Sequence, residues 1–285
     1  GSIFGFIGPS GSGKTTTVRM LTGVYAPTAG EVRVLGTAPR KFDQKTRARI
    51  GYMPQLFVLY PHLSIWENLN FVASLYGMRL FRGTKLMRTL DFVELVDQRD
   101  KLAREASGGM QRRLSLAATL VHDPELLFLD EPTAGIDPVL RRKFWDHFRE
   151  LKSEGRTLFI TTQYVNEAAY CDLVGVMAEG KLVAVDTPVG LRHRAYGGDM
   201  VDLITAAPLD YGHDPVIREL AFVRGDVVRR GPSSLRIMVD EASTAIPKLV
   251  DWSRAQNLQV KSIEEYAPPF EDVFVELVKP EAVNA

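Results

Sequence analysis

A glycine-rich run near the start of the chain has residue types that bind phosphate. Residues 8–15 read Gly-Pro-Ser-Gly-Ser-Gly-Lys-Thr and match the pattern G-x-x-x-x-G-K-[ST]. Glycines let the backbone curl so that successive N–H groups point at phosphate oxygens, and the N-terminus of a following helix adds positive potential. A chance lysine in a glycine-rich turn is the competing interpretation, but the flanking apolar strand and helical stretch favour phosphate binding. The predicted contacts are Gly8, Pro9, Ser10, Gly11, Ser12, Gly13, Lys14, Thr15 and Thr16.

Two carboxylates end a second apolar stretch, in which residues 126–129 are followed by Asp130 and Glu131. Consecutive side chains point to opposite sides of an extended chain, so these two acids can do different work. We expect Asp130 to hold Mg²⁺ together with the hydroxyl of Thr15, and Glu131 to act on an attacking water as general base or to orient it. The competing interpretation is a pair of acids that caps a turn before Pro132, and it leaves the phosphate loop without a magnesium partner.

A second glycine pair lies shortly before that stretch, where residues 107–111 read Ser-Gly-Gly-Met-Gln. A serine and two glycines at a helix start form another anion-binding nest. The run resembles the signature motif of the ATP-binding cassette (ABC) family, although Ala106 and Met110 depart from the common family residues. The resemblance implies that the nest reaches across a head-to-tail dimer to the γ-phosphate of an ATP held by a second copy. The implied contacts are Ser107, Gly108 and Gly109.

Two further loop residues match the family pattern, and a third departs from it. Gln55 resembles the glutamine that senses Mg²⁺ and the γ-phosphate, and Asp137 ends a run that resembles the D-loop. Taken alone, Gln55 is an ordinary loop residue, and its position in the series of motifs favours a ligand. Gln163 stands where the family carries a histidine on the γ-phosphate, and an amide cannot carry the charge of an imidazole. We therefore expect ATP to bind but its hydrolysis to be slow. The expected catalytic residues are Glu131 and Gln163.

The elements that must position these motifs alternate between short apolar runs and amphipathic helical stretches. This pattern predicts an α/β fold with a mainly parallel sheet up to about residue 195. The predicted strands are residues 3–7, 31–35, 50–53, 126–129, 157–161 and 173–177. Helical periodicity replaces strands between about 61 and 122. The resemblance implies a P-loop NTPase core of the RecA-like ABC type, spanning residues 1–197, with a helical subdomain inserted there.

The chain changes pattern after the Gly197-Gly198 pair, which marks a linker. Residues 198–285 predict a small α+β domain with strands at 201–205, 221–228, 235–239 and near 260, and helices at 245–254 and 271–278. Residues 268–277 resemble the closing motif of the C-terminal domain of daunorubicin-resistance-type ABC exporter ATPases. Whether this domain braces the dimer or regulates it stays open.

Composition limits the partners. The 285 residues include 35 basic and 35 acidic side chains, so no net field attracts nucleic acid, and we expect no nucleic-acid partner. No window approaches the roughly 20 consecutive apolar residues needed to cross a bilayer. The single cysteine, Cys171, allows no intrachain disulfide and fits a reducing setting, and we expect a small buried residue there rather than a reactive thiol.

The resemblance implies an ATPase subunit of an ABC exporter at the cytoplasmic face of a prokaryotic membrane, forming a homodimer and driving a separate integral-membrane permease. The alternative is an ATP-dependent dimer clamp or regulatory ABC protein with weak hydrolysis because of Gln163. A soluble ABC protein of translation or DNA repair is disfavoured, because tandem ATPase domains and long coiled coils do not appear. Residues 56–60 face the permease or belong to the core of the insert, and both interpretations stay open.

The first residues bear on adenine recognition. The sequence opens with Gly1-Ser2 inside an apolar strand, which suggests a trimmed chain or a fragment. Family members carry two antiparallel strands and an adenine-stacking aromatic residue before the phosphate loop, and this sequence begins after that point.

Overall fold

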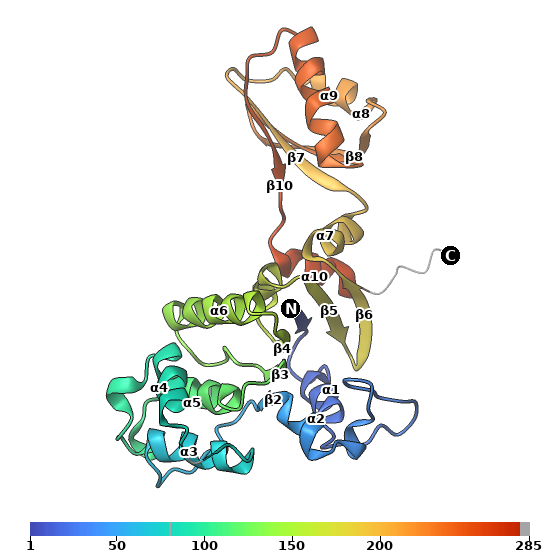
Figure 1. Ribbon diagram of the computed structural model, residues 1–285. Coiled ribbons are helices and arrows are strands. Elements are labelled where there is room, and N and C mark those ends of the chain that lie inside the picture. Colours follow the sequence, from blue (N-terminus) through green and yellow to red (C-terminus); the bar gives the residue numbers. More distant parts are fainter. Residues whose placement is uncertain (80, 280–285) are drawn as a thin grey trace. The chain divides into compact units, whose positions relative to one another are not determined.

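The computed structural model describes residues 1–79 and 81–279, and the chain divides into two compact units (Figure 1). The first unit is Gly1–Val185, and the second begins at Asp186. The predicted domain boundary, between residues 197 and 198, stays a prediction. The division into compact units describes packing and does not test where one functional domain ends and the next begins.

The first unit is built on a six-stranded sheet with the order β2-β3-β4-β1-β5-β6. β1 pairs in parallel with β4 and β5, and β3 pairs in parallel with β2 and β4, which confirms the predicted mainly parallel sheet. Because these strands run the same way, the loops that follow β1, β2, β3 and β4 meet at one edge. The strands are β1 (Ser2–Ile7), β2 (Ile50–Met53), β3 (Leu126–Asp130), β4 (Thr157–Thr162), β5 (Leu173–Ala178) and β6 (Lys181–Asp186).

Helices pack against this sheet and explain why β1 and β3 are almost entirely apolar. Helix α1 (Lys14–Leu21) contacts β3, and α6 (Pro138–Ser153) contacts β1 and β4. Phe128 of β3 packs in one cluster with Val18 of α1, while Phe144 and Phe148 of α6 are fully buried. Strands buried in this way read as continuous hydrophobic runs rather than as an alternation.

The segment between β2 and β3 confirms the predicted helical insert. It contains α3 (Ile65–Leu75), α4 (Gly83–Phe92) and α5 (Gly108–Leu120). Helix α3 starts with a capping box, in which the side chains of Ser64 and Glu67 each accept a backbone N–H of the other residue. The short helix α2 (Gln44–Ala48), which precedes β2, was not predicted.

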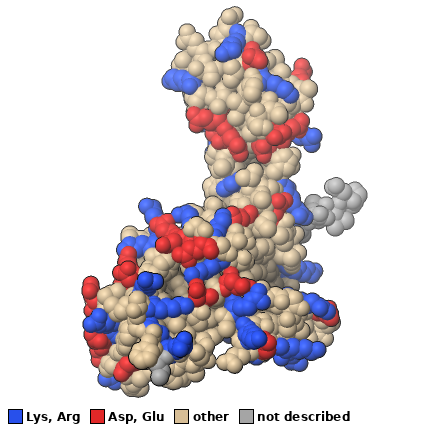
Figure 2. Space-filling view, in the orientation of Figure 1, with Lys and Arg blue, Asp and Glu red and all other residues tan. Residues whose placement is uncertain are grey.

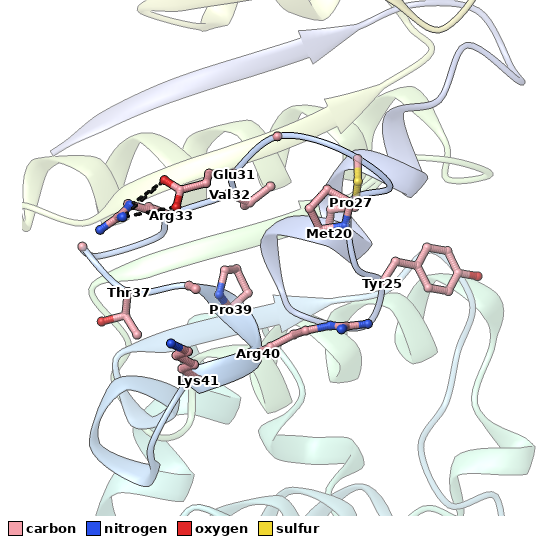
Figure 3. Close-up of a pocket in the computed structure, with 13 residues that line it drawn as sticks. Met20, Tyr25, Pro27, Glu31, Val32, Arg33, Thr37, Pro39, Arg40 and Lys41 are labelled. Carbon is pink, nitrogen blue, oxygen red and sulfur yellow. Dashed lines mark hydrogen bonds and ion pairs between the residues drawn. The ribbon is translucent and has the colours of Figure 1, made fainter.

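The strand predicted at residues 31–35 is wrong. Only an isolated antiparallel bridge between Val34 and Thr37 forms there. The chain turns back on itself at this point, so no extended strand lies beside the segment to accept and donate further ladder hydrogen bonds. The segment instead lines a pocket of about 420 Å³, together with Met20, Tyr25 and residues up to Lys41 (Figure 3). The phosphate-loop residues do not line this pocket.

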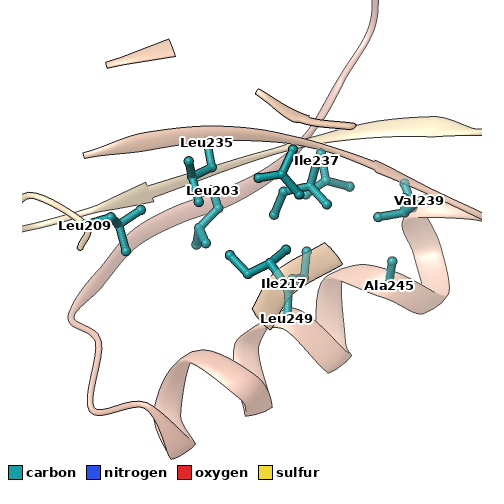
Figure 4. Close-up of a cluster of buried hydrophobic side chains, with 11 residues drawn as sticks. Leu203, Leu209, Ile217, Leu235, Ile237, Val239, Ala245 and Leu249 are labelled. Atoms are coloured by element: carbon teal, nitrogen blue, oxygen red, sulfur yellow. The ribbon is translucent and has the colours of Figure 1, made fainter. Parts of the chain in front are cut away.

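The second unit has a small α+β fold around an antiparallel sheet with the order β10-β7-β9-β8. Its core lies on one face of the sheet, where Leu203, Leu235 and Ile237 meet Ile217 and Leu249 of the helices (Figure 4). Alternate residues of β9 are buried, as expected for a sheet covered on one side. The elements are α7 (Pro188–Tyr196), β7 (Asp199–Thr205), α8 (His213–Arg218), β8 (Val223–Gly231), β9 (Ser234–Val239), α9 (Ala242–Ala255), β10 (Val260–Tyr266) and α10 (Phe270–Val278).

The surface charge, the helices and the single cysteine bear on the expectations drawn from composition. Charged side chains of both signs are interspersed over the face seen in Figure 2. Among the described helices, none is both long enough and apolar enough to span a bilayer. Cys171 is buried, as predicted, and burial raises the pKa of its thiol to about 12, so it stays protonated near neutral pH.

Candidate functional site

The glycine-rich run forms the loop between β1 and α1, at the sheet edge where the other motif loops end. Gly13 is the N-terminal cap of α1 and has a left-handed φ of 103°, which favours glycine. A Cβ atom added to Gly8 would lie 2.2 Å from the carbonyl oxygen of Met177, so no side chain fits there. The local backbone path thus favours glycine at positions 8 and 13, and the loop lies between a strand and a helix as predicted.

Lys14 is held inside this loop. Its ammonium donates hydrogen bonds to the carbonyl oxygens of Gly8 at 2.8 Å and Pro9 at 2.9 Å, and it pairs with the Glu131 carboxylate at 3.6 Å. The side chain is only 4% exposed, and burial lowers its pKa while the charge of Glu131 opposes that shift. A buried cation with neutral carbonyl partners has a strong attraction for a phosphate group that enters the loop.

Asp130 lies at the end of β3 with one oxygen in use and one free. Its Oδ1 accepts hydrogen bonds from the hydroxyls of Thr15 at 3.1 Å and Thr161 at 2.6 Å. Its Oδ2 is buried and has no hydrogen-bond partner among the described residues, and the same is true of the Oγ atom of Ser12 in the glycine-rich loop. Magnesium takes oxygen ligands of this kind, so the donor set of Thr15 and Asp130 fits the cation predicted there.

Glu131 adopts a conformation that is unusual for its residue type. Its φ is 47°, in the left-handed region, which costs roughly 1–2 kcal/mol in a residue with a side chain. Its N–H lies 2.9 Å from Thr161 Oγ1 and 3.1 Å from the Thr161 carbonyl oxygen. Gln55, in the loop after β2, donates its amide to Glu131 Oε2 at 3.1 Å. The structure therefore brings Gln55, Glu131 and Lys14 together, and the roles proposed for them stay predictions.

Other predicted residues lie outside this cluster. Ser107 caps α5 and accepts the N–H of Met110 at 3.3 Å, and Asp137 caps α6 by accepting two N–H groups that lower the pKa of its carboxyl. Gln163 follows β4 and is exposed. Within residues 1–79 and 81–279, no hydrogen bond or ion pair links Ser107, Gly108, Gly109, Asp137 or Gln163 to the Lys14 cluster, so their roles stay predictions.

Two residues of the site were missed by the sequence analysis. Thr161 contacts both Asp130 and Glu131, and Arg112 of α5 donates to backbone carbonyls of the same segment. A signal for Arg112 was present: it shares a helix face with Leu116 and Thr119, which are buried, so a charge in that row needed an explanation. Thr161 carried no comparable signal, because threonine is common in strands.

Comparisons with known proteins point the same way. The family model described as "ABC transporter" matches residues 1–134. The linearmycin resistance ATP-binding protein LnrL of Bacillus subtilis is 32% identical over 279 residues, which are 97% of this chain and 89% of that protein. The probable multidrug ABC transporter ATP-binding protein YbhF of Escherichia coli is 39% identical over 203 residues, 71% of this chain. The match spans only 35% of the length of YbhF.

Solved structures agree on the fold. A dimeric post-hydrolysis ATP-binding cassette, MJ0796 bound to ADP and Pi, superimposes with a TM-score of 0.61 at 24% identity and covers 65% of this chain and 85% of that one. At this identity the likeness concerns the fold alone. The near full-length match to LnrL goes further than the fold, because it includes the second unit as well as the motif-bearing first one. The chain belongs to the family of ABC transporter ATP-binding proteins.

Proposed function

We propose that this chain is the ATP-hydrolysing subunit of an ABC exporter and acts as a head-to-tail dimer. The observation that carries the proposal is the buried cluster at the ends of β1 and β3. Among the described residues, the partners of Lys14 there are two carbonyl oxygens and the carboxylate of Glu131. Asp130 Oδ2 is buried and has no hydrogen-bond partner among the same residues. A cation and an unsatisfied carboxylate oxygen beside a glycine-rich helix start form a site for Mg²⁺ and a triphosphate.

Each residue of the cluster has a distinct task in this proposal. The N–H groups of residues 8–16 and the ammonium of Lys14 bind the phosphates. Thr15 and Asp130 hold Mg²⁺, assisted by Gln55, and the cation supplies neutralisation of the charge that develops on the phosphate oxygens. Glu131 orients the attacking water and accepts its proton, a task that is typically worth 10²- to 10⁴-fold in rate.

The signature run supports a dimer as the active form. A Cβ atom added to Gly108 would meet none of the described atoms within 4 Å, so the described part of the fold does not require glycine there. Glycine at that position makes sense if a phosphate of a second copy approaches the start of α5, with Ser107 and Gly109 beside it. Asp137, at the start of α6, would lie near the same shared site.

A membrane permease is the proposed second partner. Leu56 is 75% exposed, Val58 is 66% exposed and Tyr60 is 51% exposed, and they follow Gln55 directly. Exposed apolar side chains in one run favour contact with a partner over a role in the core of the insert. The relatives are named for multidrug transport and linearmycin resistance, which favours export and a place at the cytoplasmic face of the membrane. The balanced charge gives no reason to propose a nucleic-acid partner.

An ATP-dependent dimer clamp with weak hydrolysis is the second candidate. The observation in its favour is Gln163, which occupies the position of the family histidine and is exposed after β4. A neutral amide gives a developing phosphate charge less stabilisation than an imidazolium does.

The test compares the steady-state Mg-ATPase rate of the chain with that of its Glu131→Gln variant and follows ATP-dependent dimerisation by light scattering in the same samples. We expect turnover in the unmodified chain, a loss of at least about 100-fold in the variant, and dimerisation in both. Dimerisation without turnover in either protein would favour the clamp. Equal turnover in the two proteins would sink the role of Glu131.

A further inference from the structure

The guanidinium of Arg112 lies where three segments of the site meet. Arg112 belongs to α5, the helix that Ser107 caps, and is only 8% exposed. It donates to the carbonyl oxygens of Gln55 at 2.6 Å and Pro132 at 2.8 Å, and more weakly to those of Pro54 and Asp130, both at 3.3 Å. A further short hydrogen bond reaches the carbonyl oxygen of Glu131.

This cation is stabilised by backbone rather than by a carboxylate partner. In the part of the chain that the structure describes, no ion pair includes Arg112, and every acceptor it uses is a main-chain carbonyl. Burial lowers the pKa of the guanidinium, and the charges of Asp130 and Glu131 oppose that shift. Because a buried charge is costly unless its hydrogen bonds are made, the side chain and the carbonyls around it fix one another in place.

The carbonyl of Glu131 is the most consequential of these acceptors. Glu131 has a left-handed φ of 47°, and its backbone N–H already donates to Thr161. Arg112 donates a hydrogen bond to the carbonyl oxygen on the other side of the same residue. A strained backbone persists only when its surroundings over-determine it, and here the two sides are fixed by different elements.

The same guanidinium also fixes the loop after β2. Its short bond to the Gln55 carbonyl holds the backbone from which the Gln55 amide reaches Glu131 Oε2. One side chain therefore sets both the main chain of the proposed general base and the residue that hydrogen-bonds its carboxylate. Nothing in the sequence motifs assigns this task to position 112.

We propose that Arg112 is a positioning residue for ATP hydrolysis, which holds Glu131 and Gln55 in the geometry that the attacking water requires. The inference rests on the proposed function, since it concerns the same site. It predicts a loss in the chemical step with little change in ATP binding, because none of the hydrogen bonds that Arg112 makes to described residues reaches the phosphate loop.

The experiment uses Arg112→Met, which keeps most of the side-chain volume, with Arg113→Met as matched control. Arg113 is the next residue of α5, donates to the carbonyls of Val93 and Glu94, and pairs with the Glu94 carboxylate away from the site. We measure kcat and KM for Mg-ATP, the Kd of a fluorescent ATP analogue, and Tm. We expect kcat to fall about 10- to 100-fold in Arg112→Met with KM and Kd within about 3-fold, and Arg113→Met to stay close to the unmodified chain.

Two further variants separate positioning from a general loss of structure. Arg112→Lys keeps the charge but offers fewer donors, so kcat should recover part of the loss. In a Glu131→Gln background, Arg112→Met should lower the residual turnover by no more than about 2-fold, because residues that act as a unit are not additive.

The outcomes are distinct. A kcat within about 3-fold of the unmodified chain, a Kd that worsens as much as kcat, or an additive loss in the Glu131→Gln background overturns the inference while leaving the proposed function intact. If Arg112→Met does not fold, Arg112→Lys decides alone: a lower kcat with unchanged Kd supports the inference, and an unchanged kcat overturns it. Absence of turnover in the unmodified chain removes the proposed function and this inference with it.

Discussion

The first unit contains two glycine-bearing helix starts, and they differ in how complete they are. At the start of α1, Lys14 is 4% exposed and lies among the loop carbonyls and Glu131, and Gly8 has no room for a side chain. At the start of α5, Ser107 and Gly108 are exposed, and no described ion pair involves residues 106 to 111. The first site brings its own cation and carboxylates, whereas the second offers only N–H groups and a hydroxyl.

This difference teaches how to separate folding demands from functional ones. Glycine at position 8 is required by the carbonyl of Met177, so the chain alone explains it. No described atom lies where a Cβ at position 108 would go, so the described residues do not require glycine there, and the proposed reason is a phosphate that approaches from a second copy. The closed site is proposed to bind ATP by itself, and the open site to act only when a second copy presents a nucleotide.

The largest expected effect breaks the closed site. Lys14→Met removes the buried cation but keeps an apolar stem of similar length, so the fold should survive. A hydrogen bond to a charged group is worth roughly 1.5–3 kcal/mol, so ATP affinity should fall about 10- to 100-fold, and dimerisation should fall with it. Titration of a fluorescent ATP analogue measures the affinity. Full affinity in a folded Lys14→Met variant would contradict the assignment of the loop.

Substitution at the open site should separate binding from turnover. Gly108→Asp places a carboxylate at a helix N-terminus, where the folded chain tolerates it well, but it repels the phosphate of a second copy. We expect turnover and ATP-dependent dimerisation to fall by at least about 10-fold. The affinity of the monomer for ATP and the Tm should stay unchanged. Gly8→Ala is the contrasting control, because its Cβ collides with Met177 and should lower Tm. Wild-type turnover in Gly108→Asp would argue against a shared site.

The smallest expected effect concerns Gln163, the exposed residue after β4. Gln163→His restores a side chain that can carry positive charge toward the γ-phosphate. Since a charge-assisted hydrogen bond is about twice as strong as a neutral one, turnover should rise by about 5-fold. The gain should be greatest below the ordinary imidazole pKa of about 6.5 and fade as pH rises, because only the protonated ring is charged. A pH profile of kcat measures this, and an unchanged rate at every pH would show that Gln163 does not limit hydrolysis.

The parts of the fold that could be predicted are those with local causes. β1, β3 and β4 are continuous apolar runs, and the helical insert has its own periodicity, so all were predicted with small errors at their ends. Residues 31–35 look equally strand-like in sequence, but a strand also needs a neighbour, which depends on distant segments. β6 was missed, since Lys181 and Asp186 at its ends and exposed positions between them hide its pattern.

The sequence by itself determined the phosphate loop, the paired acids after β3 and the signature run, because each depends on residue types at fixed spacing along a few residues of backbone. Only the tertiary structure decided that Thr161 and Arg112 hold Glu131 from both sides and that Gln55 reaches its carboxylate. Such contacts join segments that are far apart in the chain. The contacts made by Thr161 and Arg112 use the main-chain N–H and carbonyl of Glu131, groups that every residue carries, so no residue type in the sequence announces them.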